Sequence, residues 1–268
     1  MRTSLAMPDI GLGTSGHEGD EGTKRSVTAA LDVGYRHVDT AQMYGNERAV
    51  GEAIAESPVD RDDVVLATKI HPDNLGYDDA TRTARESLDR LGVDAVDLLY
   101  VHWPHSAYDP EETLRAMDDL RDEGVTDHVG LSNFTPDLLA EARDLLESPV
   151  AAHQVECHPL LPQAELRADA RDHGHALVGY SPLGRGKALD DPLLSDIAEK
   201  HDTTTAAVCL AWAFDREALV PIPKGSGDHV RANYEARELR LDDEDLDRIE
   251  AYDRRERFID PDAAAWNR

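Results

Sequence analysis

Short apolar segments alternate with longer amphipathic segments along almost the whole chain. The short segments are typical of buried strands, and the longer ones have the apolar spacing of helices that cover a sheet. The segments that predict strands are 8–13, 35–38, 64–69, 96–102, 128–132, 152–156, 176–180 and 218–222. The segments that predict helices are 23–33, 46–56, 78–91, 110–123, 136–147, 163–173, 192–201, 204–214, 228–237 and 242–252.

This alternation predicts an α/β protein with a parallel sheet, and eight strand–helix units predict a closed (β/α)8 TIM barrel. The length of 268 residues suits one such barrel, and no repeat or linker divides the chain, so we expect a single domain over residues 1–268. A doubly wound open sheet is the alternative. It is disfavoured because Gly11-Leu12-Gly13 leads into Thr14 and Ser15, without the GxGxxG pattern that opens a dinucleotide-binding helix.

Acidic residues dominate the charge and are spread over the predicted helices instead of forming a tail. The chain has 55 Asp and Glu against 28 Lys and Arg, which gives a formal net charge of -27 at pH 7. This pattern predicts a halophilic protein, because concentrated salt screens the self-repulsion; an ordinary acidic enzyme is the alternative. Nucleic acid is not an expected partner, since no basic stripe could neutralise its phosphates.

Neither a membrane segment nor a metal site is indicated. No apolar run approaches the ~20 residues that span a bilayer, and the first residues do not resemble a signal peptide, so we expect a cytoplasmic monomer without a membrane partner. Cys157 and Cys209 lie far apart, which predicts reduced thiols. The 12 histidines show no HExxH or paired Cys/His spacing, so we expect no metal.

Titratable residues end the predicted strands, at the end of a barrel that carries catalytic groups. Asp39, Lys69 and His102 end three successive strands, and Tyr44 follows Asp39 in the next loop. An ion pair between Asp39 and Lys69 would place a positive charge beside Tyr44 and lower the pKa of its phenol from about 10. Such a tyrosine can donate a proton to an alkoxide that forms in the transition state. A structural ion pair with a core histidine is the alternative, and the coincidence of all four residues argues against it.

These strand ends resemble the motifs of the aldo-keto reductases. The segment 34–41, GYRHVDTA, with Tyr44, Glu47 and Gly51, is similar to the first signature of that family. The short prokaryotic branch that includes the diketogluconate reductases looks most similar, given the short C-terminal end. The resemblance continues in order through the segments 68–69, 99–104, 130–134, 154–159, 180–184 and 222–224.

The resemblance implies an NADP-dependent oxidoreductase that moves a hydride from NADPH to an aldehyde or ketone, a small-molecule carbonyl substrate. Tyr44 would be the proton donor, and Asp39 and Lys69 would set its pKa. His102 would orient the carbonyl group. The substrate pocket would be lined by Met43, Trp103 and His102.

The resemblance also implies a set of cofactor-binding residues. In this set Ser132, Asn133 and Gln154 hold the carboxamide, and Tyr180 stacks on the nicotinamide ring. After Lys224 the chain departs from the family, because His229 stands nearest to the place of an arginine that grips the 2′-phosphate. NADPH is the expected cofactor, with NADH or dual use left open. The complete set is Ser132, Asn133, Gln154, Tyr180, Ser181, Leu183, Arg185, Lys224, Ser226, His229 and Asn233.

Two other functions stay open at this point. A non-catalytic, redox-sensing regulatory subunit of the same family would keep the fold and the cofactor, although the intact set of four titratable residues argues against it. A barrel isomerase or metal-dependent hydrolase is disfavoured, because the sequence indicates no cluster of metal ligands. The sequence does not identify the carbonyl substrate.

Overall fold

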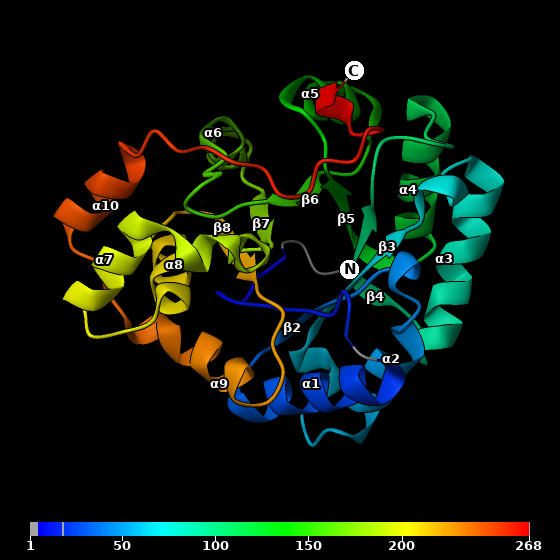
Figure 1. The fold of residues 1–268 in the computed structure, drawn as a ribbon. Helices are drawn as coiled ribbons and strands as arrows, with labels where there is room; N and C mark the ends of the chain where they lie inside the picture. The colour runs from blue at the N-terminus through cyan, green and yellow to red at the C-terminus, as the bar shows by residue number, and fades with distance from the viewer. Residues whose placement is uncertain (1–4, 18, 268) are drawn as a thin grey trace.

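The computed structural model describes residues 5–17 and 19–267, and in this part of the chain eight parallel strands follow one another in the order β1 to β8. The sheet closes because the backbone N–H groups of Gly11 and Gly13 donate to the carbonyl oxygens of Pro221 and Pro223, at 3.0 and 3.2 Å. The structure is therefore the predicted (β/α)8 barrel and not an open sheet (Figure 1). The strands are β1 (Leu12–Gly13), β2 (His37–Asp39), β3 (Val65–Ile70), β4 (Val96–Val101), β5 (Thr126–Ser132), β6 (Val150–Glu156), β7 (Ala176–Tyr180) and β8 (Leu219–Ile222).

Helices surround the strands on the outside of the barrel (Figure 1). The first of them begins at Gly19 and not at the predicted Thr23, so part of the expected polar loop is helical. Its first turn carries acidic residues and no apolar periodicity, and for this reason the sequence pattern gave no sign of it. The helices are α1 (Gly19–Val33), α2 (Glu47–Glu56), α3 (Tyr77–Leu91), α4 (Pro110–Asp122), α5 (Pro136–Leu145), α6 (Ala164–His173), α7 (Pro192–Lys200), α8 (Thr205–Phe214), α9 (Asp228–Glu235) and α10 (Asp243–Glu250).

Several helices begin where the sequence supplies a cap followed by a proline. At the start of α4 the side chain of Asp109 accepts a hydrogen bond from the N–H of Glu112 at 3.0 Å. Asp191 caps α7 in the same way. Pro110 and Pro192 occupy the first helical position, where the fixed φ of proline fits and its missing N–H is not needed. These local signals explain why the predicted starts of these helices are correct.

Two apolar layers stabilise the barrel. One lies between the strands and the surrounding helices, and the other fills the interior of the barrel. The inner layer includes the ring of Tyr100, which is fully buried. Gly130 makes room for this ring, since a Cβ at that position would lie 2.5 Å from it. Close approach also requires glycine at the closure of the barrel, where a Cβ on Gly13 would lie 2.8 Å from the carbonyl oxygen of Ile222.

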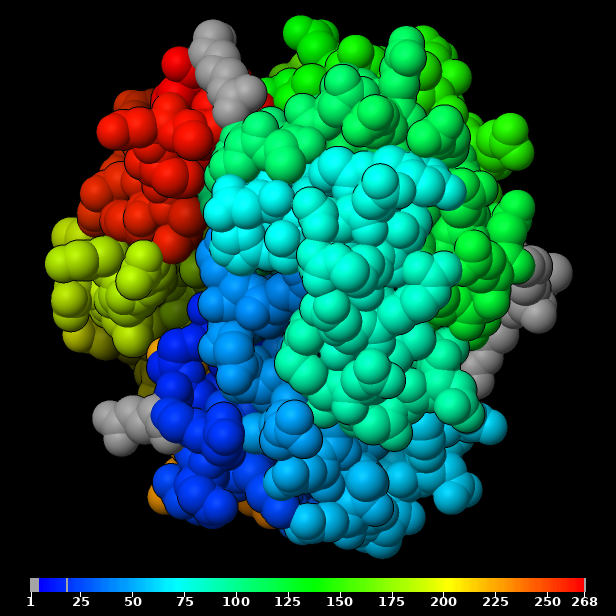
Figure 2. Space-filling view, turned by 90° about the vertical axis from the view of Figure 1, so that its right-hand side faces the viewer, coloured from blue at the N-terminus to red at the C-terminus, as the bar shows by residue number. Residues whose placement is uncertain are grey.

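The C-terminal segment returns to the barrel after α10. The backbone N–H of Glu256 donates to the carbonyl oxygen of Leu160 at 2.8 Å, which brings the segment over the loop that follows β6. Figure 2 shows the end of the chain, in red, at the upper left of the molecule, next to the green and cyan parts of the chain. Among the described residues, no helix combines the length and apolar composition needed to cross a membrane.

Candidate active site

A buried ion pair lies at the C-terminal end of the first strands. The side-chain ammonium of Lys69, on β3, donates to the carboxylate of Asp39, on β2, and to the carbonyl oxygen of Thr40 at 2.8 Å. Gln154, on β6, donates its side-chain N–H to the second oxygen of Asp39 at 2.8 Å. The predicted ion pair is thus present, and both carboxylate oxygens have a partner. Burial lowers the pKa of Lys69, and the charge of Asp39 opposes this shift.

Tyr44 stands between the ion pair and His102. The Nζ atom of Lys69 lies 5.2 Å from the centroid of the Tyr44 ring, and the His102 ring meets it edge-on, with centroids 5.7 Å apart. Burial and the negative charge of Asp39 raise the pKa of Tyr44 above its ordinary value, and a hydrogen bond with Ser15 acts in the opposite direction. The predicted lowering of this pKa is therefore wrong in direction, because burial, the largest cause, and the charge of Asp39 both raise it. A raised pKa keeps the proton on Tyr44 at neutral pH, the form that a proton donor needs.

His102 follows β4 and is 6% exposed. Its backbone carbonyl oxygen accepts a hydrogen bond from the side-chain N–H of Asn133 at 3.0 Å, which ties the histidine to the end of β5. Burial and the nearby charge of Lys69 hold the pKa of His102 well below its usual value. The ring is therefore neutral near pH 7, and a neutral imidazole can donate one N–H to a carbonyl oxygen.

A cavity of about 600 Å³ opens at this end of the barrel, within the range of small-molecule sites. Lys69 lies behind its wall and is not exposed to it. Of the residues predicted from the sequence, the cavity is lined by Asp39, Met43, Tyr44, His102, Trp103, Ser132, Asn133, Gln154, Tyr180, Ser181, Leu183, Arg185 and Lys224.

Hydrogen bonds among its own residues fix one wall of the cavity. The hydroxyl of Ser132 donates to the backbone carbonyl of Gln154 at 2.9 Å, and the hydroxyl of Tyr180 donates to the side-chain oxygen of Asn133 at 2.8 Å. Asn133 has a φ of 64°, in the left-handed region that asparagine adopts more readily than most residues. These contacts hold the Asn133 amide and the Tyr180 ring in place before any ligand binds, and the hydrogen bond to Asp39 holds the side-chain amide of Gln154.

The residues present fit a nicotinamide dinucleotide. Amide and hydroxyl groups line the inner part of the cavity, and a tyrosine ring beside them offers a stacking surface. Arg185 and Lys224 line the same cavity and supply positive charge for a pyrophosphate, in a chain that is otherwise strongly acidic. The ammonium of Lys224 also donates to the carbonyl oxygen of Gly16 at 3.3 Å. The donor set therefore matches the amide end and the charged end of such a cofactor.

Three residues of the predicted cofactor set do not line the cavity. Ser226 and His229 are exposed, and Asn233 is 6% exposed on α9. Conversely, the cavity has lining residues that the sequence did not assign to it. The glycine-rich loop after β1 could have indicated the first three of them, whereas nothing in the local sequence indicates Ile259. The residues missed are Thr14, Ser15, Gly16, Pro182, Gly186, Ile222, Pro223, Ile259 and, at the end of β1, Gly13.

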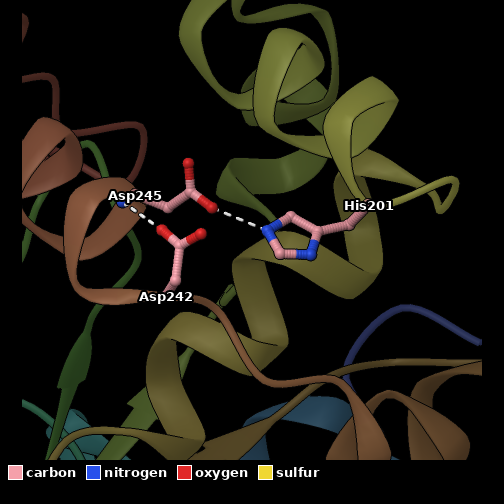
Figure 3. Close-up of side chains that lie close together, drawn as sticks. All are labelled: His201, Asp242 and Asp245. Carbon is pink, nitrogen blue, oxygen red and sulfur yellow. Dashed lines mark hydrogen bonds and ion pairs between the residues drawn. The ribbon is translucent and has the colours of Figure 1, made fainter.

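Away from the cavity lies a cluster of three side chains that could bind a metal ion, those of His201, Asp242 and Asp245 (Figure 3). The sequence spacing gave no sign of this cluster. The ammonium of Lys200 lies 2.7 Å from Asp242 and 3.0 Å from Asp245, and the Nε2 atom of His201 lies 2.6 Å from Asp245. The protein's own side chains thus contact both carboxylates, and these contacts connect the end of α7 to the start of α10.

Comparisons with known proteins agree with this geometry. The model of the aldo/keto reductase family matches residues 9–254. Methylglyoxal reductase DkgB of Escherichia coli O157:H7 is 39% identical over 97% of this chain and 98% of its own length. A solved structure provisionally described as a 2,5-diketo-D-gluconic acid reductase B is 36% identical, with a TM-score of 0.92 over 97% of this chain and 92% of that one. A Bombyx mori aldo-keto reductase solved in complex with NADP is 29% identical, with a TM-score of 0.87 over 96% and 92%.

Proposed function

The chain belongs to the aldo/keto reductase family, and from this premise we propose that it reduces an aldehyde or ketone to the alcohol with NADPH, with Tyr44 as the proton donor. Family membership and the reductase relatives support an oxidoreductase that acts on carbonyl compounds. The observation that carries the finer proposal is the meeting of Tyr44 and His102 in one cavity, directly above the Asp39–Lys69 ion pair.

The proton would come from Tyr44. A nicotinamide held in the cavity would supply the hydride for the new C–H bond at the carbonyl carbon. The carbonyl oxygen then gains negative charge and takes the phenolic proton, so the product is the alcohol. The neutral ring of His102 would hold the same oxygen by an N–H hydrogen bond, which stabilises the charge while it develops.

The buried ion pair would act on the tyrosine after the proton has left. Loss of the proton gives a phenolate, and the ammonium of Lys69 lies 5.2 Å from its ring. This charge would stabilise the phenolate. Asp39 would keep Lys69 protonated in spite of its burial.

The cofactor would lie across the cavity between its polar wall and its cations. Ser132, Asn133 and Gln154 would bind the carboxamide, and Tyr180 would cover one face of the ring. Ser181, Leu183, Arg185 and Lys224 would run along the phosphates. We propose NADPH because a related aldo-keto reductase was solved with NADP and Lys224 could also pair with a 2′-phosphate, although the exposed His229 is a weaker partner for that phosphate than an arginine.

Small polar carbonyl compounds are the substrates that we propose, because two relatives are named for methylglyoxal and for a diketo acid. Met43 and Trp103 would wall the substrate side of the cavity. We also propose that the protein is adapted to high salt, because its net charge is -27. A cytoplasmic monomer is the further part of this proposal.

Steady-state oxidation of NADPH with methylglyoxal tests this function. We expect Tyr44→Phe to lower kcat by about 10²- to 10⁴-fold without a change in cofactor binding. Tyr252→Phe is the matched control, since the Tyr252 hydroxyl bonds to Asp191 at 3.2 Å and does not line the cavity. Tight cofactor binding without turnover of any carbonyl by the wild type would instead support a regulatory subunit.

A further inference from the structure

We propose that Glu156 is a positioning residue that holds residues 256–267, here called the C-terminal strap, as a wall of the substrate pocket. The strap would thereby determine which carbonyl compounds bind well. This inference rests on the proposed function for its kinetic consequence, whereas the contact between Glu156 and the strap can be tested without any activity.

The carboxylate of Glu156 is buried at the end of β6, with 0% of the residue exposed. One of its oxygens accepts the backbone N–H of Phe258 and the other that of Ile259, both at 2.9 Å. The Nε2 atom of His158 lies 3.1 Å from the first of these oxygens. A buried carboxylate is costly unless hydrogen-bond donors surround it, and here the strap supplies two of them.

The residues held in this way reach the cavity. Ile259 is one of the lining residues, so its position depends directly on the hydrogen bond of its N–H to Glu156. The ring of Phe258 packs on the ring of His158, with centroids 5.3 Å apart. The strap is therefore fixed against β6 on both sides of the peptide bond between Phe258 and Ile259.

The far end of the strap meets a second wall residue. The ring of Trp266 lies 5.7 Å from that of Trp103, which lines the cavity. The indole N–H of Trp266 donates to the side chain of Asp260 at 2.8 Å, and the guanidinium of Arg257 lies 3.9 Å from the Trp266 ring. Internal contacts thus make the strap a unit, and displacement at Glu156 would be transmitted to the packing of Trp266 on Trp103.

The strap has little regular structure of its own to hold it there. Within residues 256–267 the only regular element is the 3-10 turn Ala265–Asn267, so the segment depends on contacts with the barrel. A substrate that is large enough to touch Ile259 or Trp103 would gain binding energy from the wall. A small substrate that reaches only Tyr44 and His102 would not. Glu156 should therefore influence KM selectively, according to the size of the substrate.

The test compares Glu156→Gln with Asp118→Asn. Asp118 is a matched control because its two oxygens also accept two backbone N–H groups, those of Glu147 and Ser148, both at 2.9 Å, and it does not line the cavity. Hydrogen exchange followed by mass spectrometry reports the protection of the amides of Phe258 and Ile259. We expect Glu156→Gln to raise their exchange rates by about tenfold or more, and Asp118→Asn to leave them unchanged.

The kinetic arm measures KM and kcat for methylglyoxal and for a bulky aromatic aldehyde. For Glu156→Gln we expect KM to rise by about tenfold for the bulky compound, with kcat for methylglyoxal and the Kd of NADPH within about twofold of wild type. Ile259→Ala, which removes the wall and keeps the anchor, should produce the same selective rise in KM. If Glu156→Gln prevents folding, this second variant still tests the wall.

The proposal would be overturned if the amides of Phe258 and Ile259 stayed protected in Glu156→Gln. It would also be overturned if Ile259→Ala raised KM equally for both substrates. A wild type that exchanges slowly at residues 258 and 259 and reduces no carbonyl would refute the proposed function alone. The two proposals therefore fail by different measurements.

Discussion

Replacement of Asp39 by asparagine would remove the charge that balances Lys69 inside the barrel. The side chain of Lys69 is 0% exposed, and its other hydrogen bond goes to the carbonyl oxygen of Thr40. An isolated ammonium at this depth is strongly disfavoured, so we expect Lys69 to lose its proton when Asp39→Asn folds at neutral pH. The free energy of that deprotonation then appears as a loss of stability.

The magnitude follows from the pKa of a free lysine, about 10.4. To keep the amine neutral costs about 1.36 kcal/mol for each pH unit below this value, or about 4.6 kcal/mol at pH 7 and about 1.9 kcal/mol at pH 9. The pKa in the folded variant lies below that in the unfolded chain, so the unfolded state binds more protons. The variant must therefore recover stability, relative to the wild type, as the pH rises from 7 to 9.

Urea unfolding followed by circular dichroism at pH 7, 8 and 9 measures this difference. Asp118→Asn serves as the control, since its buried carboxylate bonds to backbone N–H groups and pairs with no lysine in the described part of the chain; its loss of stability should not change with pH in this range. A stability difference for Asp39→Asn that is the same at pH 7 and pH 9 would show that Lys69 stays charged without Asp39. The reasoning about the ion pair would then be wrong.

Three further predictions concern acid, cofactor and salt. Burial lowers the pKa of His37 to about 4, so below pH 6.5 the unfolded chain binds a proton at this histidine that the folded protein does not. The wild type therefore loses stability as the pH falls from 6.5 toward 4. His37→Gln should abolish about 2 kcal/mol of the wild-type loss of stability at pH 5, as measured by urea unfolding. His229→Arg should raise the preference for NADPH over NADH by about tenfold in fluorescence titrations, and an unchanged ratio would count against our placement of the 2′-phosphate. Because the net charge is -27, the melting temperature and cofactor binding should rise between about 0.1 M and about 2 M KCl; full binding at low salt would contradict halophily.

Much of the fold could be predicted because its signals are local. Apolar segments marked every strand, and caps with prolines marked the starts of α4, α5 and α7. The four titratable residues were found for a related reason: parallel strands bring their C-terminal ends together, so position along the chain predicts proximity in space. Local pattern and barrel topology together were enough to place Tyr44 beside Lys69 and His102.

The rest of the site depends on properties that a linear pattern does not carry. The pKa of Tyr44 was predicted in the wrong direction because burial, which raises it, depends on the packed environment and outweighs the paired charge of Lys69. Ile259 was missed because its contact with Glu156 joins residues 103 positions apart, with no periodic signal. Ser226 and His229 are exposed at or just before the start of α9 and do not line the cavity, and their assignment to the cofactor stays a prediction.

Asp39 connects the two halves of the proposed mechanism. One of its oxygens bonds to Lys69, beneath the proton donor, and the other bonds to Gln154, in the wall proposed to bind the carboxamide. A buried ion pair contributes less to stability than apolar residues of similar size often would, so stability alone does not account for this arrangement. A regulatory subunit that only binds cofactor would need the amide wall but not a lysine beneath Tyr44. The shared carboxylate therefore favours catalysis, because only proton transfer requires both halves of the site to keep a fixed geometry relative to each other.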